Sequence, residues 1–303
     1  MNIPDFQSIM LPLLKSIGDV QEHSTKETLQ TLAAHFGLTE EQLNEMLPSR
    51  NQTIFYNRVT WAKAHLKMAS LVENTKRGHF KISQLGLDTL KTNPSQINLK
   101  FLKQFPDYLE NSGRVKGEQK PESFQESDTD ETPEEIIDLN YLKIRNTLAL
   151  ELLSKIKSCS PAFFENLVVE LLVRMGYGGT IKEAGKATKL TNDGGIDGII
   201  KEDRLGLDFI YIQAKRWDSQ PVGRPDIQSF VGALDGQRAS KGVFITTSRF
   251  ADSAVAYVKT ISKKVILIDG EQLANYMIDY GLGVSSFITY DLKRIDNDYF
   301  ELE

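Results

Sequence analysis

The stretch YIQAKRW, residues 211–217, decides how the C-terminal half of the chain is read. Side chains that follow one another on a strand point to opposite faces of the sheet. Ile210 and Ile212 therefore point to an apolar face. Gln213 and Lys215 lie next to each other on the opposite face. A polar pair at the end of a half-buried strand favours a functional site over simple core packing.

On both sides of this stretch, strand-like and helix-like segments alternate. The pattern predicts strands at 195–200, 208–215, 241–247 and 264–269, with helices at 160–177, 224–239, 251–261 and 271–280. Ser160 followed by Pro161 is typical of a helix start. The alternation predicts an α/β domain over residues 141–303, with a mixed sheet flanked by helices.

The distribution of histidine limits the chemistry of this domain. The 303-residue chain contains four histidines, all at or before position 79, and a single cysteine, Cys159. The C-terminal two thirds therefore cannot form a His/Cys zinc site or a Ser-His-Asp triad. Catalysis there must use carboxylates, amides, hydroxyls, Lys, Arg and a metal ion.

The sequence carries no sign of export or membrane insertion. Its first residues, MNIPDFQSIMLPLLK, lack the basic start of a signal peptide. No apolar run approaches the roughly 20 residues of a membrane span. One cysteine fits a reducing compartment. We therefore expect a cytoplasmic protein.

The first 95 residues predict a winged-helix DNA-binding domain of three helices and a basic hairpin with a turn at Gly78. The capping pair Ser24 and Glu27 starts one helix, and 51–69 forms another. No acidic residue occurs from 47 to 72, which suits contact with phosphate. The candidate DNA-binding residues are Asn57, Arg58, Thr60, Lys63 and Lys67 on or beside the outer face of that helix, and Lys76, Arg77 and Lys81 on the hairpin. The alternatives are a small helical domain with a solvated basic face and one that binds another subunit.

Trp61 lies on the same predicted outer face. It would pack on the linker or a second subunit, or contact DNA. Residues 96–140 read as an acidic flexible linker. Within it, 106–140 carry 3 Lys and Arg against 11 Asp and Glu, with few apolar residues to offset the entropy of ordering.

The polar face of 211–217 has a partner in the preceding strand. A hairpin centred near Arg204 would place Asp197 opposite residues 211–213. Glu165, on the helix before, could reach the same end of the sheet. Mg²⁺, or Mn²⁺ in its place, prefers such oxygen ligands. The group Asp197, Gln213 and Glu165 beside the Lys215 ammonium therefore predicts metal-dependent hydrolysis of a phosphodiester.

The arrangement resembles the PD-(D/E)XK nuclease superfamily, with Ile196-Asp197 as its first motif and Gln213-Ala214-Lys215 as its second. It departs from that pattern in having no proline before the aspartate and an amide in place of the second acid. The segments FFENLVVELLVRMGYGG, NDGGIDGII, YIQAKRW, VGRPDIQSFVGAL, KGVFITTSRF and VILIDGEQL, with YNRVTWAKAHLKMASLVENTKRGHF before the linker, resemble the Mrr family of restriction endonucleases.

That resemblance covers nearly the whole chain outside the linker. It implies a type IV enzyme that cuts DNA carrying methylated adenine or cytosine. It also implies that Asp197, Gln213, Lys215 and Glu165 are catalytic. Cutting both strands needs two active centres, so we expect a homodimer or a larger symmetric assembly. The alternatives are a structure-selective nuclease of the junction-resolving kind and a DNA-binding regulator with an inactive nuclease fold.

Overall fold

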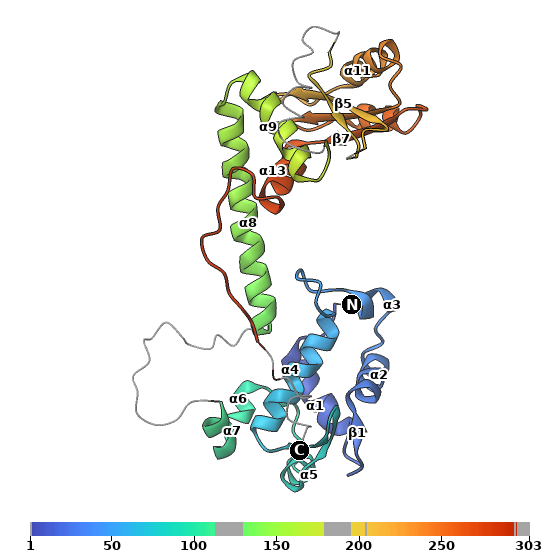
Figure 1. The fold of residues 1–303 in the computed structure, drawn as a ribbon. Coiled ribbons are helices and arrows are strands. Elements are labelled where there is room, and N and C mark those ends of the chain that lie inside the picture. The colour runs from blue at the N-terminus through green and yellow to red at the C-terminus, as the bar shows by residue number, and fades with distance from the viewer. Residues whose placement is uncertain (1, 113–129, 179–194, 204, 294, 296–303) are drawn as a thin grey trace. The chain divides into compact units, whose positions relative to one another are not determined.

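The computed structural model describes residues 2–112, 130–178, 195–203, 205–293 and 295. It divides into an N-terminal unit, which comprises the chain up to Lys143 together with Lys293, and a second unit, Ile144–Leu292. The first is mostly helical, and the second is a mixed sheet with helices on both faces, as the sequence predicts (Figure 1). In the described part of the chain, every helix is too short or too polar to cross a membrane.

The N-terminal unit has the predicted order of helices followed by a hairpin. Its elements are α1 (Phe6–Ser16), β1 (His23–Ser24), α2 (Thr25–Phe36), α3 (Glu40–Asn44), α4 (Ile54–Met68), β2 (Val72–Lys76), β3 (His79–Ile82) and α5 (Gln84–Lys91). The capping box of Ser24 and Glu27 starts α2. Gly78 adopts the left-handed conformation (φ +70°) that its hairpin turn requires. The strands pair in the order β1-β3-β2.

The core of this unit forms where α1 packs against α4. The apolar stripe of α4 faces this core, because Phe55, Val59, Ala62, Leu66 and Ala69 are all buried. Burial of such a stripe, rather than helix propensity, provides most of the stability of a helix in a protein.

The structure differs from the predicted linker at both ends. Residues 97–112 fold onto the N-terminal unit through α6 (Leu99–Leu102) and α7 (Pro106–Asn111), and Leu102 and Tyr108 are buried in its core. A long helix that the sequence pattern does not predict, α8 (Pro133–Ser158), begins within the expected linker, before residue 140. The boundary between the two units falls inside α8. Residues 113–129 lie outside the described residues.

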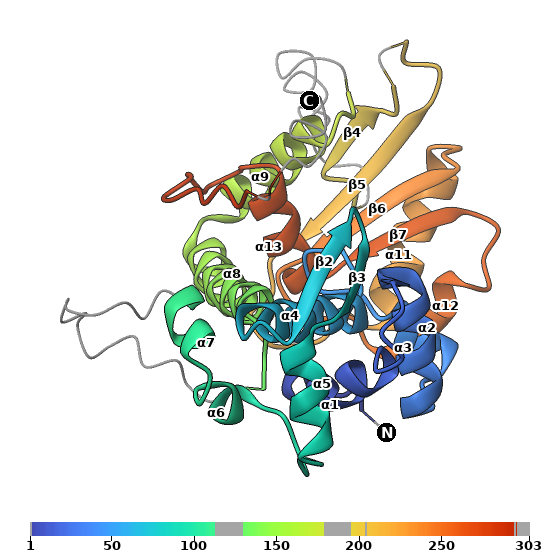
Figure 2. The same ribbon diagram turned by 90° about the horizontal axis from the view of Figure 1, so that it is seen from below.

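The second unit is built on a four-stranded sheet. Its elements after α8 are α9 (Pro161–Arg174), β4 (Gly198–Lys201), β5 (Phe209–Lys215), α11 (Arg224–Gly236), β6 (Lys241–Thr246), α12 (Asp252–Val258), β7 (Lys264–Ile268) and α13 (Gly270–Asp279). The strand order is β4-β5-β6-β7, visible in Figure 2. The first pair is antiparallel and the other two are parallel. Ser160 caps α9 with Pro161 in its first turn, as predicted.

The alternation on β5 separates two cores. Ile210 and Ile212 pack with α9 and α13 on one face of the sheet. Tyr211 and Trp217 pack on the opposite face with the core that contains Ile227 of α11. Gln213 and Lys215 therefore point toward the α11 layer, at the C-terminal end of a central strand.

Candidate active site

Asp197 is fixed to the end of β5 by two backbone contacts. Its N–H donates to the carbonyl oxygen of Ile212 (2.8 Å), and the N–H of Ala214 donates to its Oδ2 (2.7 Å). The sequence placed Asp197 inside the strand, but β4 starts one residue later, at Gly198, which pairs with Ile212. The carboxylate thus sits at the level of the residue between Gln213 and Lys215.

The amide of Gln213 is enclosed. The residue is 8% exposed. A Cβ added to Gly195 would lie 3.2 Å from Gln213 Nε2, and Gly195 has a φ of +110° that other residues rarely adopt. Glycine is therefore favoured at position 195 for two reasons: the backbone has a positive φ, and a Cβ would crowd the Gln213 side chain. Gly194 lies outside the described residues.

Lys215 makes an ion pair that the sequence pattern does not indicate. Its Nζ lies 2.7 Å from Oδ1 of Asp226, in the first turn of α11. The ammonium also lies over the ring of Trp217, 5.1 Å from the ring centroid. Thr246 Oγ1 of the neighbouring strand donates to the Lys215 carbonyl oxygen (2.8 Å). Backbone and side chain of Lys215 are therefore both held.

The fourth candidate, Glu165, lies on the helix that covers the other face of the sheet. It lies on α9 between the buried Phe164 and Leu167. Burial raises the pKa of Glu165, and the nearby charge of Asp197 raises it further. Burial also raises the pKa of Asp197, against the lowering effects of the Ala214 N–H and the Lys215 charge. Asp197 therefore interacts electrostatically with Glu165 as well as with Lys215.

These residues fit a divalent ion with oxygen ligands. Burial raises the pKa of both carboxylates, and the Asp197 charge adds to the rise at Glu165, so a shared cation would stabilise the two ionised groups. The enclosed Gln213 amide supplies a neutral oxygen. The described residues contain no cluster of three or more His, Cys, Asp or Glu suited to a metal. The candidate centre instead combines Asp197 and Glu165 with an amide.

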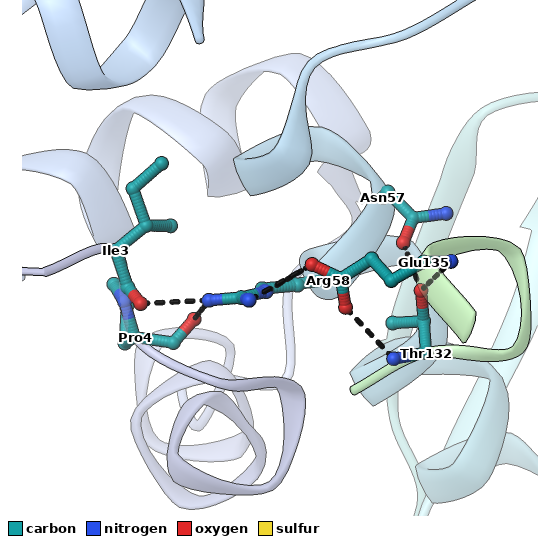
Figure 3. A network of polar contacts seen from close by, with 6 residues as sticks. All are labelled: Ile3, Pro4, Asn57, Arg58, Thr132 and Glu135. Atoms are coloured by element: carbon teal, nitrogen blue, oxygen red, sulfur yellow. Dashed lines mark hydrogen bonds and ion pairs between the residues drawn. The ribbon is translucent and has the colours of Figure 1, made fainter. Parts of the chain in front are cut away.

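Two of the candidate DNA-binding residues prove to be structural. Asn57 is 1% exposed, and its Oδ1 accepts a hydrogen bond from Thr132 Oγ1 (2.5 Å). Arg58 pairs with Glu135 of α8 (Nη2 to Oε1, 2.8 Å), and its Nη1 donates to the carbonyl oxygen of Ile3 (2.7 Å) (Figure 3). The predicted outer face of the helix is therefore covered at Asn57, and so is its flank at Arg58.

The start of α8 covers that side of α4. Trp61 Nε1 donates to Glu134 Oε2 (2.5 Å), so Trp61 packs on a residue of the predicted linker, one of the three expected contacts. Contacts of this kind join residues more than 70 positions apart. The helical period of α4 alone gives no sign of them, because a polar residue in a buried network has the same spacing as a polar residue in solvent.

The other candidates on α4 differ in accessibility. Lys67 is exposed, and Thr60 is half-buried with its hydroxyl donating to the Tyr56 carbonyl oxygen (2.8 Å). Lys63 lies over the ring of Phe80, 4.8 Å from its centroid, and donates to Thr25 Oγ1 (3.2 Å). Burial lowers the pKa of Lys63, with a smaller effect from Lys67.

On the hairpin, Lys76 and Arg77 are exposed, and Lys81 is half-buried. Lys76 pairs with Glu22 (2.6 Å), and Lys81 lies 3.8 Å from a Glu73 oxygen. Arg77 occupies the turn between them. Exposed pairs of this kind are weak and easily exchanged for other partners.

A mixed sheet flanked by helices, with a carboxylate, an amide and an amine at the ends of two adjacent strands, defines a nuclease of the restriction-endonuclease class. Residues 156–277 match a family model described as a restriction endonuclease, and residues 6–92 match the Mrr N-terminal domain. The chain belongs to the Mrr family of restriction endonucleases. The type IV methyl-directed restriction enzyme EcoKMrr of Escherichia coli (strain K12) is 33% identical over 99% of this chain and 100% of its own.

Two solved structures are distant matches. The DNA modification-dependent restriction endonuclease AspBHI is 18% identical, with a TM-score of 0.37 over 45% of this chain and 36% of its own. The MspJI restriction endonuclease in complex with a 27-mer oligonucleotide is 16% identical, with a TM-score of 0.29 over 68% of this chain and 51% of its own. The family assignment rests on the family models and the full-length relative.

Proposed function

We propose that this restriction endonuclease is of type IV and hydrolyses phosphodiester bonds in double-stranded DNA that contains methylated adenine or cytosine. One contact carries the catalytic part of the proposal. The hydrogen bond from the Ala214 N–H to Asp197 ties the acid before β4 to the strand that carries Gln213 and Lys215. The dependence on methylation is supported by the full-length relative, which is methyl-directed.

Asp197, Gln213 and Glu165 would hold Mg²⁺ or Mn²⁺. A bound ion of this kind lowers the pKa of a coordinated water and withdraws charge from a phosphate oxygen. The raised pKa values of the two carboxylates favour this role, because an unpaired buried anion costs stability that a cation restores.

Lys215 acts on the phosphate and the attacking water. Water oxygen adds to phosphorus, the bond from phosphorus to the leaving oxygen breaks, and that oxygen takes up a proton. One strand end then carries a phosphate and the other a hydroxyl. Negative charge grows on the phosphate oxygens during this step, and an ammonium fixed beside them stabilises it. Its 28% exposure leaves Lys215 accessible to a phosphate.

The DNA reader is the winged helix of residues 1–95. The proposed contacts are the accessible residues of α4 and the hairpin, namely Thr60, Lys67, Lys76, Arg77 and Lys81. Lys63 contributes less, because Phe80 and Thr25 already hold its ammonium. Neutralisation of phosphates by such side chains gives affinity without sequence preference.

We further propose a homodimer or larger symmetric assembly in the cytoplasm. Residues 141–303 provide one set of Asp197, Gln213 and Lys215 for each copy, whereas cutting a duplex requires two. DNA as the substrate requires an enzyme that shares a compartment with it.

Cleavage of one plasmid in methylated and unmethylated form tests the proposal. The wild-type protein should cut only the methylated plasmid, and only with Mg²⁺ or Mn²⁺. The Lys215→Ala variant should bind that DNA within about threefold of wild type and leave it intact. Cleavage by Lys215→Ala would refute the mechanism. Preference for branched DNA regardless of methylation would instead identify a structure-selective nuclease, and binding without cleavage a regulator.

A further inference from the structure

The ion pair of Lys215 with Asp226 joins a candidate catalytic group to a residue to which no function has been assigned. The two side chains are 28% and 23% exposed, and the Nζ to Oδ1 distance is 2.7 Å. Partly exposed ion pairs add little to stability. The main consequence of this one is therefore geometric, because it fixes the end of a long, flexible side chain.

Asp226 is itself fixed. Its Oδ2 accepts a hydrogen bond from the Gly223 N–H (3.2 Å), which ties the carboxylate to the start of α11. That helix is anchored by Ile227 and Phe230, both fully buried. A Cβ on Gly242 of β6 would lie 2.7 Å from the Phe230 ring, so the helix and the sheet are in close contact. The carboxylate is thus held at a defined height above the strands.

The backbone on either side of the ammonium is fixed as well. Thr246 Oγ1 donates to the Lys215 carbonyl oxygen (2.8 Å). Thr247 Oγ1 accepts from the Trp217 N–H (2.9 Å) and donates to the Trp217 carbonyl oxygen (2.7 Å). These bonds set where the Lys215 side chain begins. Asp226 and the Trp217 ring set where it ends.

We infer that Asp226 is a positioning residue, which holds the Lys215 ammonium beside Asp197 for the reaction. The inference rests on the proposed function and deepens it. A misplacement of about 1 Å at a reacting centre lowers a rate by roughly 100-fold. Loss of the ion pair should therefore slow cleavage while leaving DNA binding and the binding of Mg²⁺ unchanged.

The variant Asp226→Asn tests this role, because its amide oxygen still accepts the Gly223 N–H while the charge is lost. Under single turnover with saturating methylated plasmid, the cleavage rate should fall about 10- to 100-fold. The DNA dissociation constant and the Mg²⁺ concentration for half-maximal rate should stay within twofold. The cleavage rate of Asp226→Glu, which keeps the charge, should be closer to the wild-type rate. If Asp226→Asn lowers the folded fraction, the rate of Asp226→Glu is compared with that of wild type in its place.

A chemical readout tests the contact without relying on cleavage. Acetic anhydride acetylates amines that are free to react, and mass spectrometry follows each lysine. Acetylation of Lys215 should be several times faster in Asp226→Asn than in wild type. The matched control is Asp235→Asn at the other end of α11, which frees Lys263 from an ion pair of 2.9 Å. It should speed acetylation of Lys263 only and leave cleavage unchanged.

Four results would overturn the inference. Faster cleavage by Asp226→Asn would mean that the ion pair sequesters the amine. A higher Mg²⁺ requirement would make Asp226 a metal ligand. Wild-type cleavage, or unchanged acetylation of Lys215, would mean that Asp226 does not hold the ammonium. In each of these cases wild type still cuts, so the proposed function stands. A wild-type protein that cuts no methylated DNA would remove both.

Discussion

Replacement of Arg58 by methionine should destabilise the N-terminal unit without removing a contact to DNA. Arg58 donates through Nε and Nη2 to Glu135 Oε1 (2.8 Å each) and through Nη1 to the carbonyl oxygens of Ile3 and Pro4 (2.7 and 3.2 Å). Methionine keeps much of the apolar stem and leaves all these acceptors without their donor.

The expected loss follows from the burial of the pair. The side chain of Glu135 is 7% exposed and that of Arg58 is 18% exposed. Removing one partner of a buried pair costs about 3–5 kcal/mol, since the remaining charge stays buried. The carboxylate keeps one donor, the Thr132 N–H (2.7 Å). We therefore expect the lower end, about 3 kcal/mol, or more than 100-fold in the folding equilibrium.

Urea unfolding of the full chain, followed by a probe in the N-terminal unit, measures the loss in free energy of unfolding. The protein contains two tryptophans, Trp61 and Trp217. In a Trp217→Phe background the fluorescence of Trp61, whose indole contacts Glu134, reports on the N-terminal unit. The control is Lys91→Met in the exposed pair with Asp88 (2.7 Å) of the same unit, which should cost less than about 1 kcal/mol.

The double variant Arg58→Met with Glu135→Leu separates the charge from the packing. Replacing a whole buried pair by apolar residues is often neutral or stabilising, so the double variant should recover most of the loss. If Arg58→Met costs under about 1 kcal/mol and weakens DNA binding tenfold or more, the reasoning fails. Arg58 would then be a DNA contact, as the sequence pattern suggested.

Two further predictions concern the candidate active site. Asp197→Asn should raise the thermal midpoint at neutral pH in EDTA, because burial raises the pKa of Asp197 above its ordinary 3.8. The folded state then binds the proton more tightly than the unfolded state does. Ionised Asp197 therefore lowers the stability of the fold above the folded pKa, and this loss of stability fades as the pH falls toward 3.8. An equal gain in melts from pH 7 to pH 4 would contradict this. Gly195→Ala should slow plasmid cleavage about tenfold or more with little change in gel-shift affinity, because the new Cβ meets Gln213 Nε2 at 3.2 Å and the φ of +110° is strained. A wild-type rate would show that the turn does not position the amide.

The sequence was sufficient to predict the features that depend only on residues close together in the chain. Strand alternation set the two faces of β5, and both faces proved to be covered. A short connection to the preceding strand made an antiparallel hairpin, which brings Asp197 to the level of Ala214. These features depend on residues close in sequence, so a period of two and a loop length determine them.

The sequence was insufficient where contacts join distant segments. The helical period places Asn57 and Arg58 away from the main apolar stripe of α4, yet both meet the start of α8. An acidic, polar composition predicted a long linker, but Glu134 and Glu135 serve as partners for α4. Asp226 was missed for a similar reason. An acid in the first turn of a helix suits the macrodipole there, and nothing local shows that Lys215 is its partner.

The candidate site also shows how a fold can hold buried carboxylates whose ionised forms lower its stability. Burial raises the pKa of both Asp197 and Glu165, so their ionised forms destabilise the folded chain. Four of the polar residues in and beside the site each have a buried apolar residue next to them in sequence. These pairs are Phe164-Glu165, Ile196-Asp197, Ile212-Gln213 and Asp226-Ile227. Burying one such side chain contributes about 1.5–3 kcal/mol, which offsets the placement of its polar neighbour. Packing on both faces of the sheet therefore fixes the backbone that carries these side chains, and the ion pair with Asp226 fixes the end of the Lys215 side chain.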